Sequence, residues 1–144
     1  MKQALLLSCF IGGLSFMFPS FAANTSADLL KEYTMQQGYS EISQNIANAL
    51  IENKKGVLID VRTPEEFAEG HIEGAINIPV ETIKDDELLK EVPDTKTPLL
   101  IYCRTGRRAS DAGQTLVKNG YQYVVNFGGV STWQYGLVQN PDTK

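Results

Sequence analysis

Histidine, cysteine and tryptophan are scarce in this chain of 144 residues, which contains one histidine, two cysteines and one tryptophan. Because His71 is the only histidine, a zinc centre built from cysteine and histidine ligands is not expected. An excess of positive charge is also missing, since 13 lysines and arginines stand against 17 acidic residues and leave a net charge of −4. An acidic chain is a poor partner for nucleic acid or for an anionic membrane surface. We therefore expect no metal and no nucleic-acid partner.

Long apolar runs are missing too, except at the amino terminus, where residues 4–18 are mostly apolar. Lys2 precedes this run, and Ser20-Phe21-Ala22 follows it as a small-x-small cleavage site. The pattern predicts a secretory signal peptide over residues 1–22, too short for a comfortable membrane span. The alternative, an uncleaved anchor, lacks a stop-transfer flank. Cleavage would leave one exported domain with a net charge of −5 and no membrane partner.

Export makes the scarcity of cysteine informative. Cys9 lies inside the predicted signal peptide, so Cys103 is expected to be the only cysteine of the mature chain. In an oxidising compartment paired cysteines normally form disulfides, but a single cysteine cannot form one within its own chain. Cys103 is therefore either an incidental buried residue or a reactive thiol.

The surroundings of Cys103 favour a reactive thiol. An apolar run, Leu99–Tyr102, leads into the segment Cys103-Arg104-Thr105-Gly106-Arg107-Arg108-Ala109, and a helical pattern follows at once. A position between a strand end and a helix start favours an anion, and the thiolate is the nucleophilic form of cysteine. Three nearby arginines also predict a thiol that is not fully buried. The alternative is an unreactive surface cysteine in a basic turn.

The loop that follows Cys103 has the composition of an anion-binding site. Gly106 permits a tight turn, and successive backbone N–H groups can then point inward around an oxyanion or a terminal sulfur. Arg104 and Arg107 add positive charge, and Arg104 is expected to point outward. Arg108 closes the loop and is the best candidate for direct contact with an anionic donor.

Strand and helix patterns alternate along the rest of the chain. Residues 23–38 form a polar lead-in that is partly helical, and residues 39–144 form the domain. Strands are predicted at 39–42, 57–61, 75–79, 99–102 and 123–127. Helices are predicted at 44–53 after Ser43, from Pro64 with Thr63 and Glu66 as a capping box, at 80–92, and at 106–119 before Gly120. This order predicts an α/β fold with about five strands, a mainly parallel sheet and helices on both faces.

Four segments, taken together and in order, resemble the single-domain rhodaneses, a family of sulfurtransferases. They are residues 58–67, residues 70–79, the Cys103 loop, and residues 128–133 with Gly136. The resemblance spans roughly residues 39–138 and implies the rhodanese-like fold. Together with the signal peptide, the chain is similar to the small periplasmic rhodaneses of Gram-negative bacteria, which implies a periplasmic location.

The resemblance also implies a mechanism. The thiolate of Cys103 attacks the outer sulfur of a small anionic donor such as thiosulfate, and the loop from Arg104 to Ala109 holds the persulfide that forms. The acceptor is cyanide in an assay and a thiol in the cell, which includes the thiol of a partner protein. Two half-reactions of this kind predict ping-pong kinetics, and no cofactor is needed.

Other residues of the resemblance have supporting roles. Asp60 and Arg62 match the pair that lies beneath the family's active loop, where Asp60 bonds loop amides or an arginine and Arg62 orients the loop or the donor. The alternative for this pair is a structural salt bridge at a strand end, which we favour. For His71 we favour a structural turn over a general base, and for Trp133 we favour core packing over a substrate platform.

Two other functions stay open at this point. Related cysteine phosphatases and arsenate reductases have a loop one residue longer, closed by an arginine six positions after the cysteine. Ala109 occupies that position here, and Tyr102 precedes the cysteine where many phosphatases have histidine. The other alternative is a non-catalytic rhodanese module that binds partners or carries persulfide sulfur, although modules of that kind often lack the cysteine.

Overall fold

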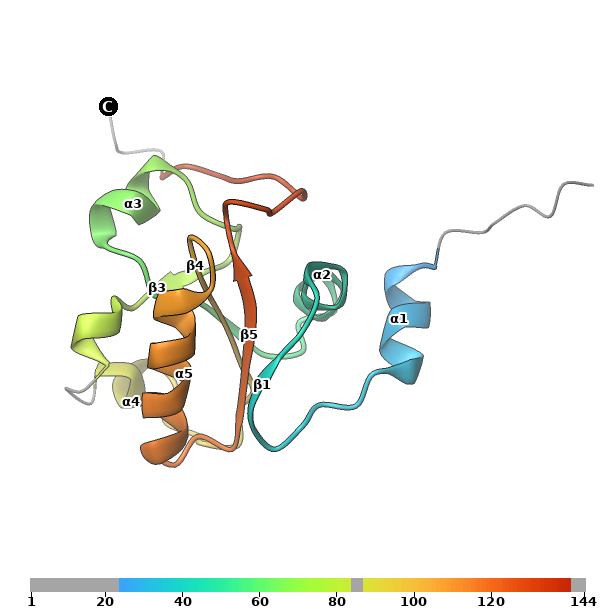
Figure 1. Ribbon diagram of the computed structural model, residues 1–144, viewed down its shortest axis with the longest axis horizontal. Helices are drawn as coiled ribbons and strands as arrows, with labels where there is room; N and C mark the ends of the chain where they lie inside the picture. Colours follow the sequence, from blue (N-terminus) through green and yellow to red (C-terminus); the bar gives the residue numbers. More distant parts are fainter. Residues whose placement is uncertain (1–23, 84–86, 141–144) are drawn as a thin grey trace, which may run out of the picture.

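The computed structural model describes residues 24–83 and 87–140, so the predicted signal peptide lies outside the described residues. The elements follow one another along the chain as shown in Figure 1. They are α1 (Ser26–Glu32), β1 (Gly38–Glu41), α2 (Gln44–Glu52), β2 (Val57–Asp60), α3 (Pro64–Glu69), β3 (Ile76–Asn77), a 3-10 turn η1 (Val80–Thr82), α4 (Glu87–Glu91), β4 (Leu99–Cys103), α5 (Arg107–Lys118) and β5 (Tyr123–Gly129).

The five strands form one sheet in the order β1-β5-β4-β2-β3, and every pairing in it is parallel. The α/β fold predicted from the alternating patterns is confirmed, with a sheet that is entirely rather than mainly parallel. Parallel strands have their carboxyl ends at one edge of the sheet, where ligands bind in such folds. Because β2 and β4 are neighbours, Asp60 and Cys103 reach that edge side by side.

The central strand β4 explains why the sheet needs a cover on both faces. All five of its residues are buried, and their side chains alternate between two separate cores. Leu99 and Ile101 face one core, whereas Leu100 and Tyr102 face the other. Each fully buried aliphatic side chain contributes about 2 kcal/mol of hydrophobic stabilisation. A continuous apolar run of this kind is typical of a doubly covered parallel strand.

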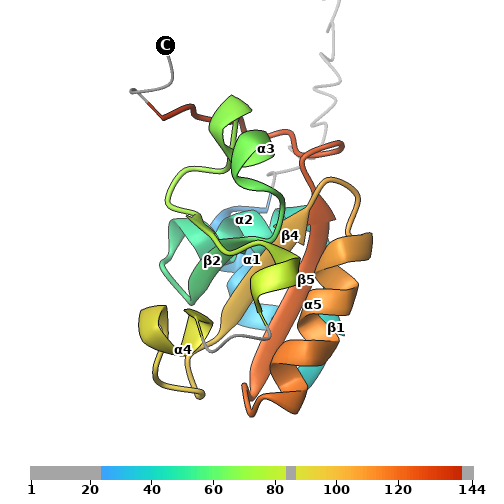
Figure 2. The same cartoon turned by 90° about the vertical axis from the view of Figure 1, so that its left-hand side faces the viewer.

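The helices cover the sheet as predicted. On one face lie α5, α4 and η1, and on the other lies α2 with α1 packed outside it (Figure 1). A view turned by 90° shows α3 and the chain after β5 crossing above the carboxyl ends of the strands (Figure 2). Within the described residues no helix combines the length and the apolar character that a bilayer crossing requires.

The helix ends follow local signals in most cases. The capping box of α3 is confirmed, because the Thr63 hydroxyl accepts from the Glu66 N–H and the Glu66 carboxylate accepts from the Thr63 N–H. Gly120 ends α5 at a φ of +99°. Ser43 occupies the N-cap of α2, but its hydroxyl donates to the Asn45 side chain and makes no capping bond.

Two predicted elements are wrong in extent. The strand predicted at 75–79 is only β3, because the Ala75 N–H donates to the Ile72 carbonyl in the preceding turn and Pro79 is already the N-cap of η1. The helix predicted at 80–92 is not continuous, since η1 and α4 are separate elements. At η1 the amide and the hydroxyl of Thr82 both donate to the Pro79 carbonyl, which closes a 3-10 turn.

Candidate active site

Cys103 ends β4, and its sulfur lies beneath the loop that leads into α5. Gly106 makes the turn at a φ of +104°, and its N–H donates to the Cys103 Sγ at 3.0 Å. Cys103 is only 1 % exposed, so the prediction of a thiol that is not fully buried is wrong. The reason is that the loop turns back over the sulfur, while the side chains of Arg104 and Arg107 extend into solvent.

Asn126 of β5 fixes the loop from below. Its side-chain NH2 donates to the Gly106 carbonyl at 3.0 Å and to the Tyr39 hydroxyl at 3.0 Å. Its side-chain carbonyl accepts from the Gly128 N–H at 2.9 Å. Asn126 is buried, and a buried amide with these partners holds a turn in one geometry. Sequence reasoning missed this residue, although a polar side chain inside an apolar strand pattern was a usable signal.

Gly129 allows β5 to approach the loop closely. Ile101 pairs with Asn126, whereas Cys103 pairs with Gly129, so β5 contains one extra residue between these two pairs. A Cβ built on Gly129 would lie 2.3 Å from backbone atoms of both Cys103 and Arg104. Only glycine fits at this position.

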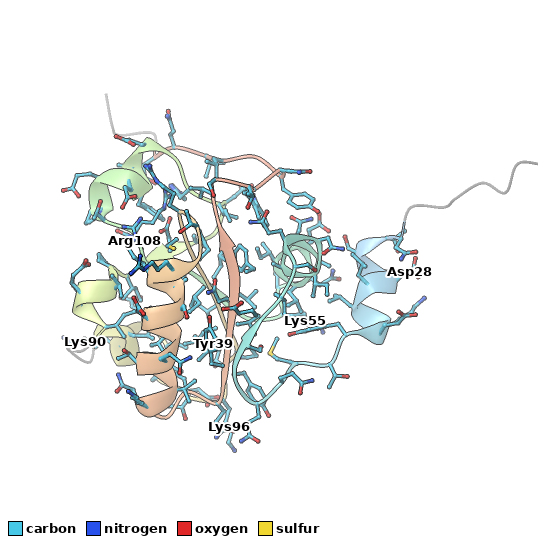
Figure 3. All side chains as sticks on the ribbon, in the orientation of Figure 1. Asp28, Tyr39, Lys55, Lys90, Lys96 and Arg108 are labelled. Atoms are coloured by element: carbon cyan, nitrogen blue, oxygen red, sulfur yellow. The ribbon has the colours of Figure 1, made fainter. Side chains whose placement is uncertain are left out.

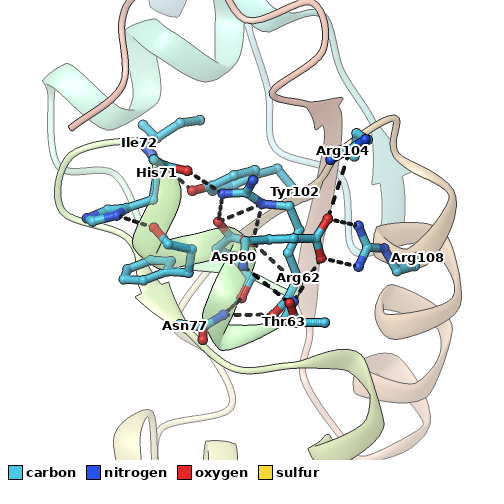
Figure 4. A network of polar contacts seen from close by, with 12 residues as sticks. Asp60, Arg62, Thr63, His71, Ile72, Asn77, Tyr102, Arg104 and Arg108 are labelled. Carbon is cyan, nitrogen blue, oxygen red and sulfur yellow. Dashed lines mark hydrogen bonds and ion pairs between the residues drawn. The ribbon is translucent and has the colours of Figure 1, made fainter. Parts of the chain in front are cut away.

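Glu66 of α3 is the second residue whose role sequence reasoning missed. Its two carboxylate oxygens accept from both terminal nitrogens of Arg108, at 2.7 and 2.9 Å. The Arg104 Nε lies 3.8 Å from the same carboxylate. Figure 4 shows Arg104 and Arg108 on the same side of this polar network, and Figure 3 shows Arg108 at the upper end of α5. Glu66 was predicted only as a helix cap, yet it connects α3 to the Cys103 loop.

The ionisation of these groups reflects the contact. The hydrogen bonds from Arg108 lower the pKa of Glu66 from 4.5 to about 2. The same bonds raise the pKa of Arg108, and a contact with the Cys103 side chain adds to this effect. Arg108 therefore interacts with both the Glu66 carboxylate and the Cys103 side chain. Each terminal nitrogen of this predicted donor-binding arginine gives one hydrogen bond to Glu66 in this structure.

The Glu66–Arg108 pair predicts a specific pH dependence of stability. A carboxylate whose pKa is lower in the folded state stabilises the fold above its unfolded pKa, and the benefit is lost as the pH falls. We expect Glu66→Gln to lower the free energy of unfolding at pH 7 by about 1 kcal/mol, because the pair is partly exposed and screened. The difference from the unsubstituted protein should disappear between pH 4.5 and about 2, measured by urea unfolding.

Glutamine keeps one side-chain oxygen that can accept the Thr63 N–H of the capping box, so the substitution removes the charge and one of the two bonds to Arg108 but keeps the helix cap. Glu65→Gln, on the exposed side of the same helix turn, is the matched control and should show little difference at either pH. A difference between Glu66→Gln and the unsubstituted protein that stays constant down to pH 2 would contradict the ionic explanation.

Asp60 and Arg62 form a buried pair beneath the same edge. The Arg62 guanidinium donates to both Asp60 oxygens, and its Nη2 also donates to the Gly70 carbonyl at 2.7 Å. Tyr102 lies against this pair, with its ring 5.9 Å from the Arg62 guanidinium carbon, and burial raises its pKa. The Tyr102 hydroxyl accepts from the Ile72 N–H. These contacts tie β2, β4 and the chain after α3 together (Figure 4), which favours the structural interpretation of the pair.

His71 and Trp133 also make structural contacts. The His71 ring stacks on Phe67 at 3.7 Å, and its Nδ1 lies 2.9 Å from the Phe67 carbonyl oxygen. Trp133 packs against Phe127 and donates to the Gly136 carbonyl. Trp133 lines a cavity of about 760 Å³ between α2 and the chain after β5, which includes no residue of the Cys103 loop.

Three further residues of the Cys103 loop line a cavity on the side of β1. Arg107, Thr105 and Gly106 line a cavity of about 420 Å³ together with Glu41 and Ser110. Ala109 is fully buried in the core under α5. Across residues 24–83 and 87–140 there is no group of three side chains suited to hold a metal ion. The groups that contact the Cys103 side chain are the Gly106 amide and the Arg108 guanidinium.

Comparison with known proteins identifies relatives of the whole domain. The family described as the rhodanese-like domain matches residues 43–135. Thiosulfate sulfurtransferase PspE of Escherichia coli is 40% identical over 72 residues, which cover 50% of this chain and 68% of that protein. A sulfurtransferase of Allochromatium vinosum is 34% identical over 97 residues, covering 66% of this chain and 88% of that protein. A solved structure described as a rhodanese with anions from E. coli is 35% identical, with a TM-score of 0.55, and covers 59% of this chain and 99% of that one.

Proposed function

The chain belongs to the rhodanese-like sulfurtransferase family, and we propose that it transfers sulfane sulfur from thiosulfate or a similar anionic donor to a thiophilic acceptor through a persulfide on Cys103. The observation that carries the proposal is the environment of the sulfur. The Gly106 N–H donates to Sγ at 3.0 Å, and the Arg108 guanidinium lies beside it. Both groups stabilise negative charge on sulfur.

In the first half-reaction the Cys103 thiolate attacks the outer sulfur of thiosulfate. The new S–S bond forms on Cys103, the S–S bond of thiosulfate breaks, and its electron pair leaves with sulfite. The terminal sulfur of the persulfide then carries the negative charge. The Gly106 amide and the Arg108 guanidinium, which already contact the Cys103 side chain, are proposed to stabilise this charge, as the donors of a preorganised anion site do.

In the second half-reaction an acceptor nucleophile attacks the terminal sulfur. Cyanide takes it as thiocyanate and a thiolate takes it as a persulfide, and in both cases the electron pair of the broken S–S bond restores the Cys103 thiolate. The acceptor in the cell is proposed to be a thiol, either of a small molecule or of a partner protein. The buried position of the sulfur favours acceptors with a slender reacting end.

The position of Ala109 supports sulfur chemistry over phosphate chemistry. Alanine is uncharged, and the Ala109 side chain faces the core. The sixth residue after the cysteine therefore contributes no positive charge to the loop. A phosphoryl group carries its charge on several oxygens and is stabilised by bidentate arginines directed at them. The single sulfur of a persulfide needs fewer donors.

Initial rates and intact mass together test this function. With thiosulfate and cyanide varied, we expect ping-pong kinetics with parallel double-reciprocal lines, because the donor product leaves before the acceptor binds. Thiosulfate alone should add the mass of one sulfur atom to the protein, and cyanide should remove it. Added sulfur without turnover would indicate that the protein is a sulfur carrier. The absence of both turnover and added sulfur would indicate a non-catalytic binding module.

We also propose that the protein is exported to the periplasm. The proposal rests on the sequence of residues 1–22, in which a positive start, an apolar run and a small-residue cleavage site follow one another. The same intact-mass measurement on protein recovered from the periplasmic fraction tests it. A chain that starts at Ala23 supports export, and a chain that keeps residues 1–22 in the cytosol overturns it.

A further inference from the structure

The region around the Cys103 sulfur carries less positive charge than the three arginines of its loop suggest. Arg107 lines the cavity on the side of Glu41, whereas Arg108 contacts the Cys103 side chain and is paired with Glu66, which Arg104 approaches at 3.8 Å. The buried Asp60–Arg62 pair nearby adds no net charge. Two guanidinium groups and one carboxylate carry a net charge of +1. A thiolate on Cys103 would bring the sum to zero.

Glu66 holds this negative charge in a fixed place. Its carboxylate is paired at both oxygens with Arg108, only 21% of its side chain is exposed, and its own helix turn fixes its backbone through the capping box with Thr63. It remains ionised down to about pH 2, so it carries its charge at every pH at which the protein would work. An anion held by Arg108 next to the sulfur therefore lies close to a permanent carboxylate.

We propose that Glu66 determines donor specificity by charge: its carboxylate disfavours doubly charged donors such as thiosulfate relative to singly charged or neutral sulfane-sulfur donors, of which a persulfide carried on a thiol is the matching class. This inference rests on the proposed sulfur transfer. With such a donor, R–S–SH, the Cys103 thiolate attacks the terminal sulfur, and the electron pair of the broken S–S bond leaves on the thiolate R–S⁻. The persulfide on Cys103 keeps the proton.

The effect of the carboxylate should scale with the charge of the approaching molecule. The interaction energy between two groups is proportional to the product of their charges, so a neutral molecule is unaffected. For a separation of about 6 Å in a water-like medium, removing the negative charge of Glu66 should raise the reaction rate of a dianion at Cys103 about tenfold and that of a monoanion about threefold. If Glu66 had a purely structural role, its replacement would change the reaction rates of all molecules at Cys103 by the same factor.

Two alkylating agents of nearly equal size provide the test. Iodoacetamide is neutral and iodoacetate is singly charged, so burial of the sulfur slows both alike. In Glu66→Gln the ratio of the iodoacetate rate to the iodoacetamide rate at Cys103 should rise about threefold, and kcat/KM for thiosulfate should rise about tenfold. High salt should reduce both effects, because the site is partly open to solvent.

Matched variants keep the result interpretable. Glu65→Gln makes the same change of charge at an exposed position of the same helix turn and should leave the ratio unchanged. Arg104→Gln removes one positive charge from an exposed side chain and should lower the ratio about threefold, so the proposal stays testable even if Glu66→Gln fails to fold.

Each result has a definite meaning. An unchanged ratio in both Glu66→Gln and Arg104→Gln, or an equal acceleration of both reagents, would overturn the proposal and leave Glu66 as a brace for Arg108. The alkylation ratio does not depend on sulfur transfer. A shifted ratio without turnover would therefore support the charge effect and refute the proposed function. Turnover with an unshifted ratio would support the proposed function and refute the charge effect.

Discussion

Replacing Cys103 with serine is expected to lower the rate of thiocyanate formation from thiosulfate and cyanide by at least about 10³-fold, because the nucleophile of both half-reactions is removed. The serine hydroxyl is a weak nucleophile without a general base, and the contacts described around residue 103 come from an amide and a guanidinium, which are donors. The measurement is the initial rate together with intact mass after incubation with thiosulfate. No sulfur atom should be added.

The fold should survive this substitution. Serine is close to cysteine in size, and its oxygen can accept the Gly106 N–H that the sulfur accepts now. The unfolding temperature of Cys103→Ser should therefore change by only a few degrees. Cys9→Ser, made in the chain that keeps residues 1–22, is the matched control and should keep both turnover and the added sulfur. Residual sulfur transfer by Cys103→Ser at a tenth of the normal rate would refute the persulfide mechanism.

Local sequence patterns were sufficient for much of this fold. The apolar run Leu99–Tyr102 predicted the strand that leads to Cys103, and Thr63, Pro64 and Glu66 predicted the start of α3. Both signals act within a few residues, so they can be read without knowledge of the rest of the chain. The position of Cys103 at the carboxyl edge then followed from the parallel sheet.

The prediction of a helix over residues 80–92 shows where local patterns are insufficient. The apolar spacing was real, because Ile83, Leu88 and Val92 are buried in one core. Side chains at such positions can reach a core from several short turns as well as from one helix, and the Thr82 bonds to Pro79 favour the 3-10 turn. The apolar spacing of residues 80–92 therefore marked positions that reach the core, but it did not determine the backbone conformation between them.

In the candidate site, too, the features formed by consecutive residues were predicted and the contacts between distant residues were not. The loop and its glycine turn were visible in consecutive residues, but the partner of Arg108 was not, because Glu66 lies 42 positions away on another helix. The consequence is chemical as well as structural. An arginine assigned to an anionic donor from its position in the loop is already paired, and the charge at the site is smaller than a count of arginines indicates.

Replacing Gly129 with alanine is expected to have the largest effect on stability of any single methyl group added near the site. The new Cβ would lie 2.3 Å from the carbonyl oxygens of Cys103 and Arg104, and these backbone atoms cannot rotate away as a side chain could. We expect the free energy of unfolding to fall by more than about 4 kcal/mol, because β5 and the loop must separate. Any folded protein should lose at least about 100-fold in kcat/KM, since small displacements of reacting groups are costly.

Gly70→Ala is the matched control, because it adds the same methyl group at the same edge of the sheet. Gly70 has an extended backbone with a φ of 165°, and its new Cβ would make ordinary contact with Leu137 at 3.6 Å. Its stability, measured by urea unfolding, should change by less than about 1 kcal/mol. If Gly129→Ala were as stable and as active as Gly70→Ala, the loop could not be held against β5 at the observed distance. The amide of Gly106 would then have no fixed position from which to hold the sulfur of Cys103.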